Sequence, residues 1–374
     1  MIIRKALAVF GRIVPVLILI SLGTALLVEL VPGDPAVAMV GAEGTPEQYA
    51  AVRAELGLDN PWFIRYFDWL GGLLQGDLGR TMVPPVQDVS DLIASRLPVT
   101  LEIAMLSVLL ALVISIPVGT WSAYSYGRTF DKAASAVSFG LISVPSFLLA
   151  LIVIYIAVFS PSVVTVSIIV VSVASAAALF LGARRAGTSK TDRARRTTIL
   201  LGTGVLISGI LLALLLPDFP RQGFVRLGEG GIGENLRTVA LPVLVLGLAE
   251  SAQLTRVLRS DMATTLNEDF ILAARAQGMP RRHILVKQAL RPSTFSLVTV
   301  AGISFGRLLG GTVIVETIFR LPGMGTLIVD SVSKKEYVVL QAAVLVVAAL
   351  YVLVNALVDL SYAYLDPRTR HATA

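Results

Sequence analysis

The longest uncharged segment of this chain, 133–183, constrains its fold more than any other feature. Between Lys132 and Arg184 there are 51 residues, and none of them is charged. As a single helix rising about 1.5 Å per residue, the segment would be roughly 76 Å long. That is more than twice the roughly 30 Å thickness of a membrane hydrocarbon core. The segment therefore has to reverse direction, and Ser160-Pro161-Ser162 is the predicted turn.

Other apolar runs are also long enough to cross a membrane, which takes about 20 residues. With the two halves of the uncharged segment they predict eight spans, at about 13–31, 99–121, 135–159, 162–182, 199–216, 239–256, 294–318 and 339–363. The chain is 55% hydrophobic and 15% charged, whereas a soluble domain carries about 25% charged residues. The sequence therefore predicts an all-α polytopic membrane protein.

The distribution of cations predicts how the spans are oriented. An even number of spans places both termini on the same side of the membrane. The segments on that side hold 20 Lys and Arg residues, against 10 on the other side. Because cytoplasmic loops carry the excess of cations, both termini are predicted to be cytoplasmic. The same rule accounts for the net charge of +6, and without a nucleic-acid-binding motif we expect no nucleic-acid partner.

The longest outer segment, 32–98, is predicted to contain two short helices. Thr45-Pro46-Glu47-Gln48 has the pattern of a capping box, which predicts a helix that stops at Gly57. A second helix is expected to start near Asn60-Pro61 and to run through WFIRYFDWLGGLL. Its aromatic residues suit the boundary between membrane and water, and they equally suit the packed core of a small extracytoplasmic cap.

The segment DFILAARAQGMPRRHILVKQALRP, 269–292, is polar and basic although it lies between apolar runs. Asn267 is predicted to cap a first helix that ends at Gly278, and Pro280 is predicted to open a second one. The cations at the start of the second helix are unfavourable there and require an acidic neighbour. Such a cytoplasmic segment suits docking into a groove of another protein or lying on lipid as a surface helix.

The same segment resembles the EAA loop of ABC-importer permeases, which forms a coupling helix that sits in a cleft of the ATPase subunit. Ala273, Ala274 and Gly278 match the EAA-x3-G core, whereas Leu272 replaces the Glu of the general pattern and Gln288 replaces an Ile. The local form DFILAARAQGM is similar to the oligopeptide and dipeptide branch. Further segments agree with that branch: LVPGDPA (30–36), ELGLDNPWFIRYFDWLGGLLQGDLGRT (55–81), SRLPVTLEIA (95–104), VPSF (144–147), LPVLVLGL (241–248), FGRLLGGTVIVETIF (305–319), PGMGTL (322–327) and YLDPRTR (364–370).

These segments cover most of 1–158 and 238–370, and they resemble the B-type permease subunit of bacterial oligopeptide and dipeptide ABC importers. The resemblance implies a type I ABC importer transmembrane-domain fold in the bacterial cytoplasmic membrane. It implies a non-catalytic peptide permease, with ATP and Mg bound by partner ATPase subunits and no cofactor in this chain. The implied partners are a second, C-type permease, two ATPase domains, an extracytoplasmic peptide-binding protein and membrane lipid. The residues implied in ATPase coupling are Asp269, Phe270, Ala273, Ala274, Arg275, Gly278, Met279 and Arg282.

Such permeases usually have six spans, so the resemblance marks 160–218 as an inserted transmembrane hairpin. Its cytoplasmic loop, 183–198, is basic, and we expect it either to lie near anionic lipid or to contact a regulatory partner. The expected organisation is a cytoplasmic N-terminus and first span (1–31), an extracytoplasmic helical region (32–98), the second and third spans (99–159), the inserted hairpin (160–218), and a permease core (219–370) with a coupling loop (257–293).

A stripe of small residues lies on the span expected at 294–318. Gly302, Gly306 and Gly310 recur every four residues, a spacing that lets two helix backbones approach closely. The stripe predicts close helix packing, either within the chain or against the second permease subunit.

The same span contains two ionisable residues for which we expect functional roles. Arg307 lies near its midplane, where a cation has to face a partner or a wet cavity. Arg307 either lines the translocation pathway and meets a substrate carboxylate, or it pairs with Glu250, Glu102 or Asp359. Glu250 is a further candidate for the pathway. Glu316, near the outer end, is expected at a subunit interface or in an outer gate.

No catalytic or metal site is predicted. His283 and His371 have no ligand spacing, there is no cysteine, and the G-x4-G-K-[ST] pattern that binds nucleotide phosphates is absent from the sequence. Two alternatives to a peptide-importer permease are an autonomous secondary transporter and an importer of the same family that carries a metal chelate or haem. A secondary transporter would favour inverted repeats and buried ionisable relays, and the sequence shows no convincing repeat.

Overall fold

The computed structural model describes residues 2–30, 33–41, 43–185, 203, 219–220 and 223–365 of the 374. These residues belong to two compact units, Met1–Phe147 with Pro242–Ala374, and Leu148–Leu241. Within the described ranges the regular elements are all helices. A helix satisfies its backbone hydrogen bonds internally, as a chain in a hydrocarbon core requires. The predicted all-α class is confirmed.

Among the described residues, five helical segments are long and apolar enough to cross a membrane: α1 (Ile2–Leu30), α5 (Val89–Tyr124), α10 (Leu227–Thr265), the run Arg281–Gly311 that contains α13 (Leu290–Gly311), and α16 (Tyr337–Leu365). The helix α6 (Thr129–Ser143) and the segment Ser146–Phe159 are bent by 100° against each other, and they make a sixth if they count as one broken span. The continuous span expected at 135–159 is therefore wrong, and the bend comes at Pro145, which cannot continue a helix. A polytopic membrane protein is thereby confirmed. The span expected at 199–216 lies outside the described residues except for Thr203, so the count of eight and the cytoplasmic termini stay predictions.

The unit Leu148–Leu241 contains the break predicted in the uncharged segment. Helix α7 (Ser146–Ile154) continues as the π-helical turn η1 (Tyr155–Phe159), and α8 (Pro161–Arg185) follows. Between them, Ser160 has a non-helical backbone with φ −137° and ψ 56°, and proline is well suited to the first position of a helix. The break is therefore confirmed. Beyond Arg185, the basic loop lies outside the described residues.

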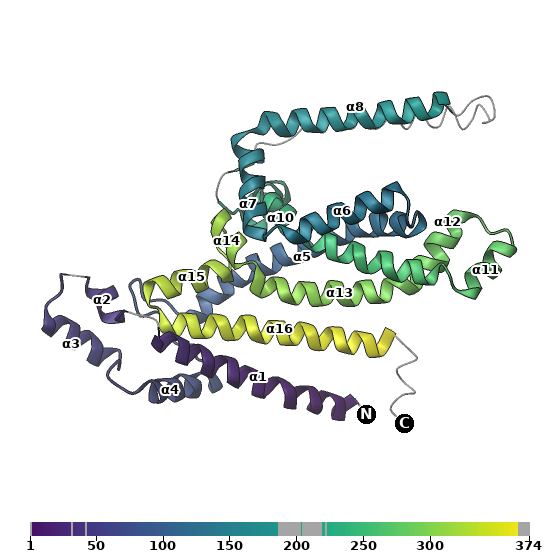
Figure 1. Cartoon of the computed structure of the whole chain (residues 1–374). Coiled ribbons are helices and arrows are strands. Elements are labelled where there is room, and N and C mark those ends of the chain that lie inside the picture. The colour runs from purple at the N-terminus through teal and green to yellow at the C-terminus, as the bar shows by residue number, and fades with distance from the viewer. Residues whose placement is uncertain are drawn as a thin grey trace. The chain divides into compact units, whose positions relative to one another are not determined.

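In the other unit, α16 lies beside both α1 and α13, and α13 also packs against α5 (Figure 1). Two glycines permit the close approach of α13 and α16. A Cβ atom on Gly302 would lie 2.4 Å from Val358, and one on Gly306 would lie 3.3 Å from Tyr351, whereas one on Gly310 would meet nothing within 4 Å. The glycine stripe therefore packs within the chain at two of its three positions.

The two helices expected in the outer segment both form, and the first has the predicted capping box. Helix α3 (Pro46–Glu55) has a complete capping box between Thr45 and Gln48, and Gly57 follows its end with φ 61°. Helix α4 (Trp62–Leu74) begins directly after Pro61. A shorter helix, α2 (Pro35–Val40), precedes them and is capped by the Asp34 side chain. Local sequence chemistry was sufficient to locate α3 and α4, because the capping box of α3 and the proline before α4 lie next to these helices in the chain.

A hydrophobic core joins the first turns of α5 and α16 to α15 (Met324–Lys334). Val89 is fully buried in it, and Trp69 of α4 packs against it. The Glu336 carboxylate, directly before α16, accepts hydrogen bonds from the N–H of Met82 at 2.7 Å and of Val83 at 2.6 Å. These contacts fix the segment that precedes α5 against the start of α16, about 250 residues later in the chain.

We expect Gly302→Val to lower the stability of the chain by about 1–3 kcal/mol, because the new side chain has to displace a stiff β-branched residue. Gly310→Val is the matched control, since it makes the same change on the same helix where a Cβ atom meets nothing within 4 Å. Thermal unfolding of the purified chain in detergent should show a lower Tm for the first variant only. Equal Tm values for the two variants would contradict close packing of α13 on α16.

Candidate functional site

The coupling loop, 257–293, connects α10 to α13 through three short elements. Helix α11 (Asp269–Ala276) is followed by Gly278 with φ 71°, a conformation that favours glycine. Helix α12 (Arg281–His283) starts after Pro280, and the π-helical turn η3 (Ile284–Ala289) leads into α13. The predicted end at Gly278 and the predicted start at Pro280 are both confirmed.

The prediction that Asn267 caps α11 is wrong. The N-cap position belongs to Glu268, whose side chain makes no capping hydrogen bond. Asn267 instead donates its side-chain Nδ2 to the Ala263 carbonyl at 2.9 Å, in the last turn of α10. The last carbonyls of a helix lack backbone partners, so the amide is used at the end of one helix rather than at the start of the next.

The residues expected to couple the loop to an ATPase differ in exposure. Those that are exposed are Asp269, Phe270, Ala273, Arg275, Gly278 and Arg282. Met279 is half-buried, and Ala274 is buried together with Ile271. Ala274 therefore packs inside the loop rather than presenting a surface. On α11, Phe270 and Leu272 are 47% and 57% exposed, so this helix offers apolar area for a contact.

An ion pair that the sequence reasoning missed joins the coupling-loop end of α10 to the start of α6. Arg259 donates from Nε and Nη2 to the Asp131 carboxylate, at 2.5 and 2.9 Å. The buried carboxylate also accepts from Ser122 Oγ at 2.5 Å and from the Gly127 N–H at 2.9 Å. Bidentate, charge-assisted hydrogen bonds of this kind are strong and directional, so they hold the two helix ends in one geometry.

The coupling loop is also attached to α5 by a hydrogen bond. Arg281 donates from Nη1 to the Tyr124 hydroxyl at 3.1 Å, at the end of α5.

The sequence contained a signal for the ion pair between Arg259 and Asp131. Asp131 is the only acidic residue between Glu102 and Asp192, and a lone carboxylate next to apolar spans requires a partner. The identity of that partner was not predictable, since it lies 128 residues away in the chain.

A pocket of about 790 Å³ lies among side chains of α6, α10 and α13. At its edge, Arg307 donates from Nη2 to both oxygens of Glu250, at 2.9 and 2.7 Å, and to Gln253 Oε1 at 2.9 Å. Its acidic partner is therefore Glu250 rather than Glu102 or Asp359. The Glu250 side chain is 9% exposed and that of Arg307 is 53% exposed, so the ion pair leaves the cation open to the pocket.

The other cations of this pocket are held differently. The Arg259 guanidinium is neutralised by Asp131 and also lies over the Tyr126 ring, at 4.7 Å. Arg256 lies over the Phe139 ring at 4.8 Å and has no ion pair within the described part of the chain. The pocket therefore carries an excess of positive charge. Nowhere in the described ranges do three or more His, Asp or Glu side chains lie close enough together to hold a metal ion.

Glu316, in α14 (Val313–Phe319), is fully buried. Its Oε1 accepts from the hydroxyls of Thr100 at 2.7 Å and Thr312 at 2.8 Å. Its Oε2 accepts from the N–H groups of Gly325 at 2.7 Å and Thr326 at 3.2 Å. The carboxylate thus connects α5, α14 and the start of α15. In this arrangement the Glu316 side chain has no exposed surface. Its expected role in a gate or at a subunit interface stays a prediction.

An ion cluster holds the outer helices α2 and α3 together. Arg53 of α3 pairs with Asp34, the N-cap of α2, and with Asp59 Oδ1 at 2.9 Å. The hydrogen bonds to Asp59 and to Asp34 raise the pKa of the Arg53 guanidinium above its ordinary value. Exposed pairs of this kind contribute little to stability, so we expect this one to orient the two helices rather than to hold the fold.

Comparison with known proteins gives two family matches that together cover almost the whole chain. Residues 115–371 match the family of binding-protein-dependent transport system inner membrane components, and residues 1–104 match the N-terminal family of such membrane components. The chain is 33% identical over 362 residues to the dipeptide transport system permease protein DppB of Escherichia coli (96% of this chain and 97% of the relative). It is 30% identical over 359 residues to the oligopeptide transport system permease protein AppB of Bacillus subtilis (96% of each).

Glu316→Gln should destabilise the chain by about 2 kcal/mol or more, because an amide nitrogen would face donors that now bind a carboxylate. Glu55→Gln on the exposed face of α3 is the control and should leave the Tm unchanged. Both variants can be compared with the wild type by thermal unfolding in detergent. An unchanged Tm for Glu316→Gln would show that the buried carboxylate does not stabilise the contact among α5, α14 and α15.

Proposed function

Because the chain belongs to the family of binding-protein-dependent transport system inner membrane components, we propose that it is the permease subunit of an ATP-driven peptide importer. It is a multi-pass protein of the bacterial inner membrane. Its curated relatives DppB and AppB are named as dipeptide and oligopeptide transport permeases and match it almost from end to end. That full-length similarity is the reason for proposing peptides as the solute.

The proposed assembly has this chain as one half of the translocation pathway and a second permease as the other half. Two cytoplasmic ATPase domains bind ATP and Mg and supply the energy, and an extracytoplasmic binding protein delivers the peptide. This chain itself carries out no chemistry. The outer helices α2, α3 and α4 are the proposed contact for the binding protein, since they extend beyond the spans.

The observation that carries the proposal is the construction of the coupling loop. Its buried residues, Ile271, Ala274 and Ile284, make it a packed unit rather than a loose connection. Phe270 and Leu272 leave apolar area on its surface. An exposed apolar face on a short, internally packed helix suits insertion into a groove of a partner protein. The ATPase cleft is the partner groove that we propose.

The coupling loop is directly continuous with the two helices that carry the polar pocket. It begins at the end of α10, which carries Glu250 and Gln253, and it ends at the start of α13, which carries Arg307. A movement of the loop would therefore shift these two helices against each other and alter the contact between Arg307 and Glu250. In this mechanism, ATP-driven closure of the ATPases moves the loop, and the spans alternate between outward and inward access.

The charge of the pocket suits the carboxylate end of a peptide. Arg307 remains half-exposed although Glu250 binds it. Arg256 lies over the Phe139 ring and pairs with no carboxylate among the residues that the structure describes. Guanidinium groups bind carboxylates in a bidentate geometry. We propose that a peptide carboxylate binds Arg256 or Arg307 during passage and competes with Glu250 for the second of these.

Phe270→Asp and Leu272→Asp should each weaken ATPase binding by about 2 kcal/mol, roughly thirtyfold, if these residues are central to the contact. Val86→Asp is the control because Val86 is equally exposed, at 60%, but lies in the outer segment. The transporter is purified through this chain, and the ATPase that remains bound is quantified. Unchanged ATPase retention in both α11 variants would rule out α11 as the docking helix.

A double-mutant cycle separates the two roles of Arg307. If its guanidinium binds substrate, Arg307→Gln should reduce peptide uptake roughly tenfold, and combining it with Glu250→Gln should not restore uptake. If Arg307 only neutralises Glu250, the double variant should transport almost normally, because no unpaired buried charge remains. Uptake is measured in proteoliposomes that contain the whole transporter, with the ATPase rate as a check on assembly. Restored uptake in the double variant would refute the pathway role.

A further inference from the structure

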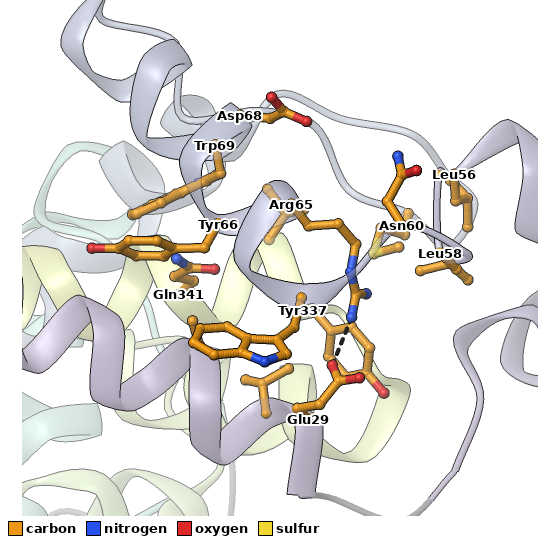
Figure 2. A pocket seen from close by; sticks show the side chains of 16 residues that line it. Glu29, Leu56, Leu58, Asn60, Arg65, Tyr66, Asp68, Trp69, Tyr337 and Gln341 are labelled. Atoms are coloured by element: carbon orange, nitrogen blue, oxygen red, sulfur yellow. Dashed lines mark hydrogen bonds and ion pairs between the residues drawn. The ribbon is translucent and has the colours of Figure 1, made fainter.

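A second pocket, of about 250 Å³, has no part in the proposed transport mechanism. It lies between α4, the last turns of α1 and the first turns of α16 (Figure 2). Helix α5 begins in the hydrophobic core described above, and Trp69, which lines this pocket, packs against that core. The same helix ends at Tyr124, which contacts the coupling loop. Because α5 has 36 residues, the pocket lies far from the coupling loop, at the end of the spans predicted to be extracytoplasmic.

The pocket contains buried donor groups that have no acceptor. Nε2 of Gln341, Nε1 of Trp69 and Nε of Arg65 all line it or adjoin it, and none finds a hydrogen-bond partner within the described part of the chain. Gln341 is only 8% exposed, and Figure 2 shows its amide next to the Tyr66 side chain. Native proteins rarely leave buried donors unpaired. Three of them at one small pocket indicate a bound group that supplies acceptor oxygens.

Charged residues line the other side of the pocket, and their net charge restricts the charge of a ligand that can bind there. Arg65 donates from Nη2 to Glu29 Oε2 at 2.6 Å, beside the Tyr337 ring (Figure 2). Asp68 is the remaining charged residue of the lining. With two carboxylates and one guanidinium, the lining has an excess of negative charge. A ligand that brings a cation close to its acceptor oxygens therefore matches the pocket, whereas a simple anion does not.

The position of α4 indicates where such a ligand comes from. Phe63, Phe67 and Leu74 of this helix are 48%, 63% and 82% exposed. Large aromatic and aliphatic side chains on the outside of an amphipathic helix suit the boundary between membrane and water. A pocket enclosed by this helix and two span ends opens at the depth of the lipid headgroups. Among molecules that carry both a cation and acceptor oxygens, zwitterionic lipids are therefore the most concentrated at this pocket.

We propose that this pocket binds the headgroup of a zwitterionic phospholipid, phosphatidylethanolamine being the probe of choice. The phosphate or ester oxygens accept hydrogen bonds from Gln341 and Trp69, and the ammonium group lies toward Glu29, whose side chain is 45% exposed. Exposed leucines near the end of α1, Leu26, Leu27 and Leu30, offer a surface for the acyl chains. Phosphatidylglycerol matches less well, because it brings no cation to the carboxylates and Glu29 already neutralises Arg65.

The test measures how lipid changes the Tm of the intact transporter, since a ligand of the folded state raises the Tm. The complex is purified in detergent, depleted of lipid, and supplied with phosphatidylethanolamine or phosphatidylglycerol. Two further arms add glycerophosphoethanolamine, which has the headgroup without acyl chains, and a dipeptide, which is also a zwitterion. We expect a clear upward shift with phosphatidylethanolamine, a smaller one with glycerophosphoethanolamine and none with phosphatidylglycerol. Any shift with the dipeptide arises at the transport pathway, so it should be the same in the wild type and in Gln341→Leu.

Two variants remove the unpaired donors. Gln341→Leu keeps a side chain of similar size, and Trp69→Phe replaces the indole with a smaller ring. Gln341→Leu and Trp69→Phe should each reduce the apparent affinity for phosphatidylethanolamine about fivefold, the effect of one lost hydrogen bond. Gln75→Leu and Trp121→Phe make the same changes outside the pocket and should respond like the wild type. Glu29→Gln releases the Arg65 charge, so it should move the preference toward phosphatidylglycerol.

Three results would overturn the proposal. One is an equal response of the wild type to the two phospholipids. The second is an undiminished response of the Gln341→Leu and Trp69→Phe variants to phosphatidylethanolamine. The third is a dipeptide-induced rise in Tm that Gln341→Leu and Trp69→Phe abolish, which would assign the same chemistry to substrate rather than lipid. Before lipid is added, Gln341→Leu should not lower the Tm, because it removes a donor without a partner. A lower Tm there would mean that the amide already has a partner, and would equally overturn the proposal.

Discussion

The hydrocarbon core of a membrane offers no hydrogen-bonding partner to a polar or charged group, so each such group in a span needs a partner from the protein. The described helices meet this requirement with groups that lie far apart in the chain. Arg307 binds Glu250 and Gln253, and Asp131 binds Arg259. Glu316 accepts four hydrogen bonds, from α5, from α15 and from Thr312 at the junction of α13 and α14. These few polar contacts determine how α5, α6, α10 and α13 are arranged, since the surrounding apolar surfaces are much less specific.

The same contacts connect the two ends of the proposed mechanism. The coupling loop lies between α10 and α13, and these helices meet again at the Arg307–Glu250 pair. At the cytoplasmic end predicted from the charges, Arg259 holds α10 to the start of α6 and Arg281 holds the loop to the end of α5. A displacement of the loop therefore has a continuous path of packed and hydrogen-bonded groups to the pocket. The lipid pocket beneath α4 lies on a different part of the unit and depends on a different set of residues.

The sequence predicted local features well where the determining groups are neighbours in the chain. Thr45 and Gln48 form the capping box, Gly278 ends α11, and α8 starts at Pro161. The prediction for Asn267 was wrong although it also concerns a local group. The Asn267 amide lies between the end of α10 and the start of α11, and it donates to a carbonyl of α10. For the candidate site, the sequence indicated that Arg307 requires a partner or a cavity. Both proved to be present, as an ion pair at the edge of a pocket.

What the sequence by itself determined is the class of the protein: helical, polytopic and divided by a break in the uncharged segment, because apolar length and the energetic cost of unpaired backbone groups leave few alternatives. Its motif also located the loop in which we propose the coupling contact. Only the tertiary structure decided which carboxylate binds Arg307, that Glu316 and Ala274 are buried, and that Gly302 but not Gly310 packs against α16. Those outcomes depend on how helices distant in sequence pack together, and no periodicity within one segment encodes that packing.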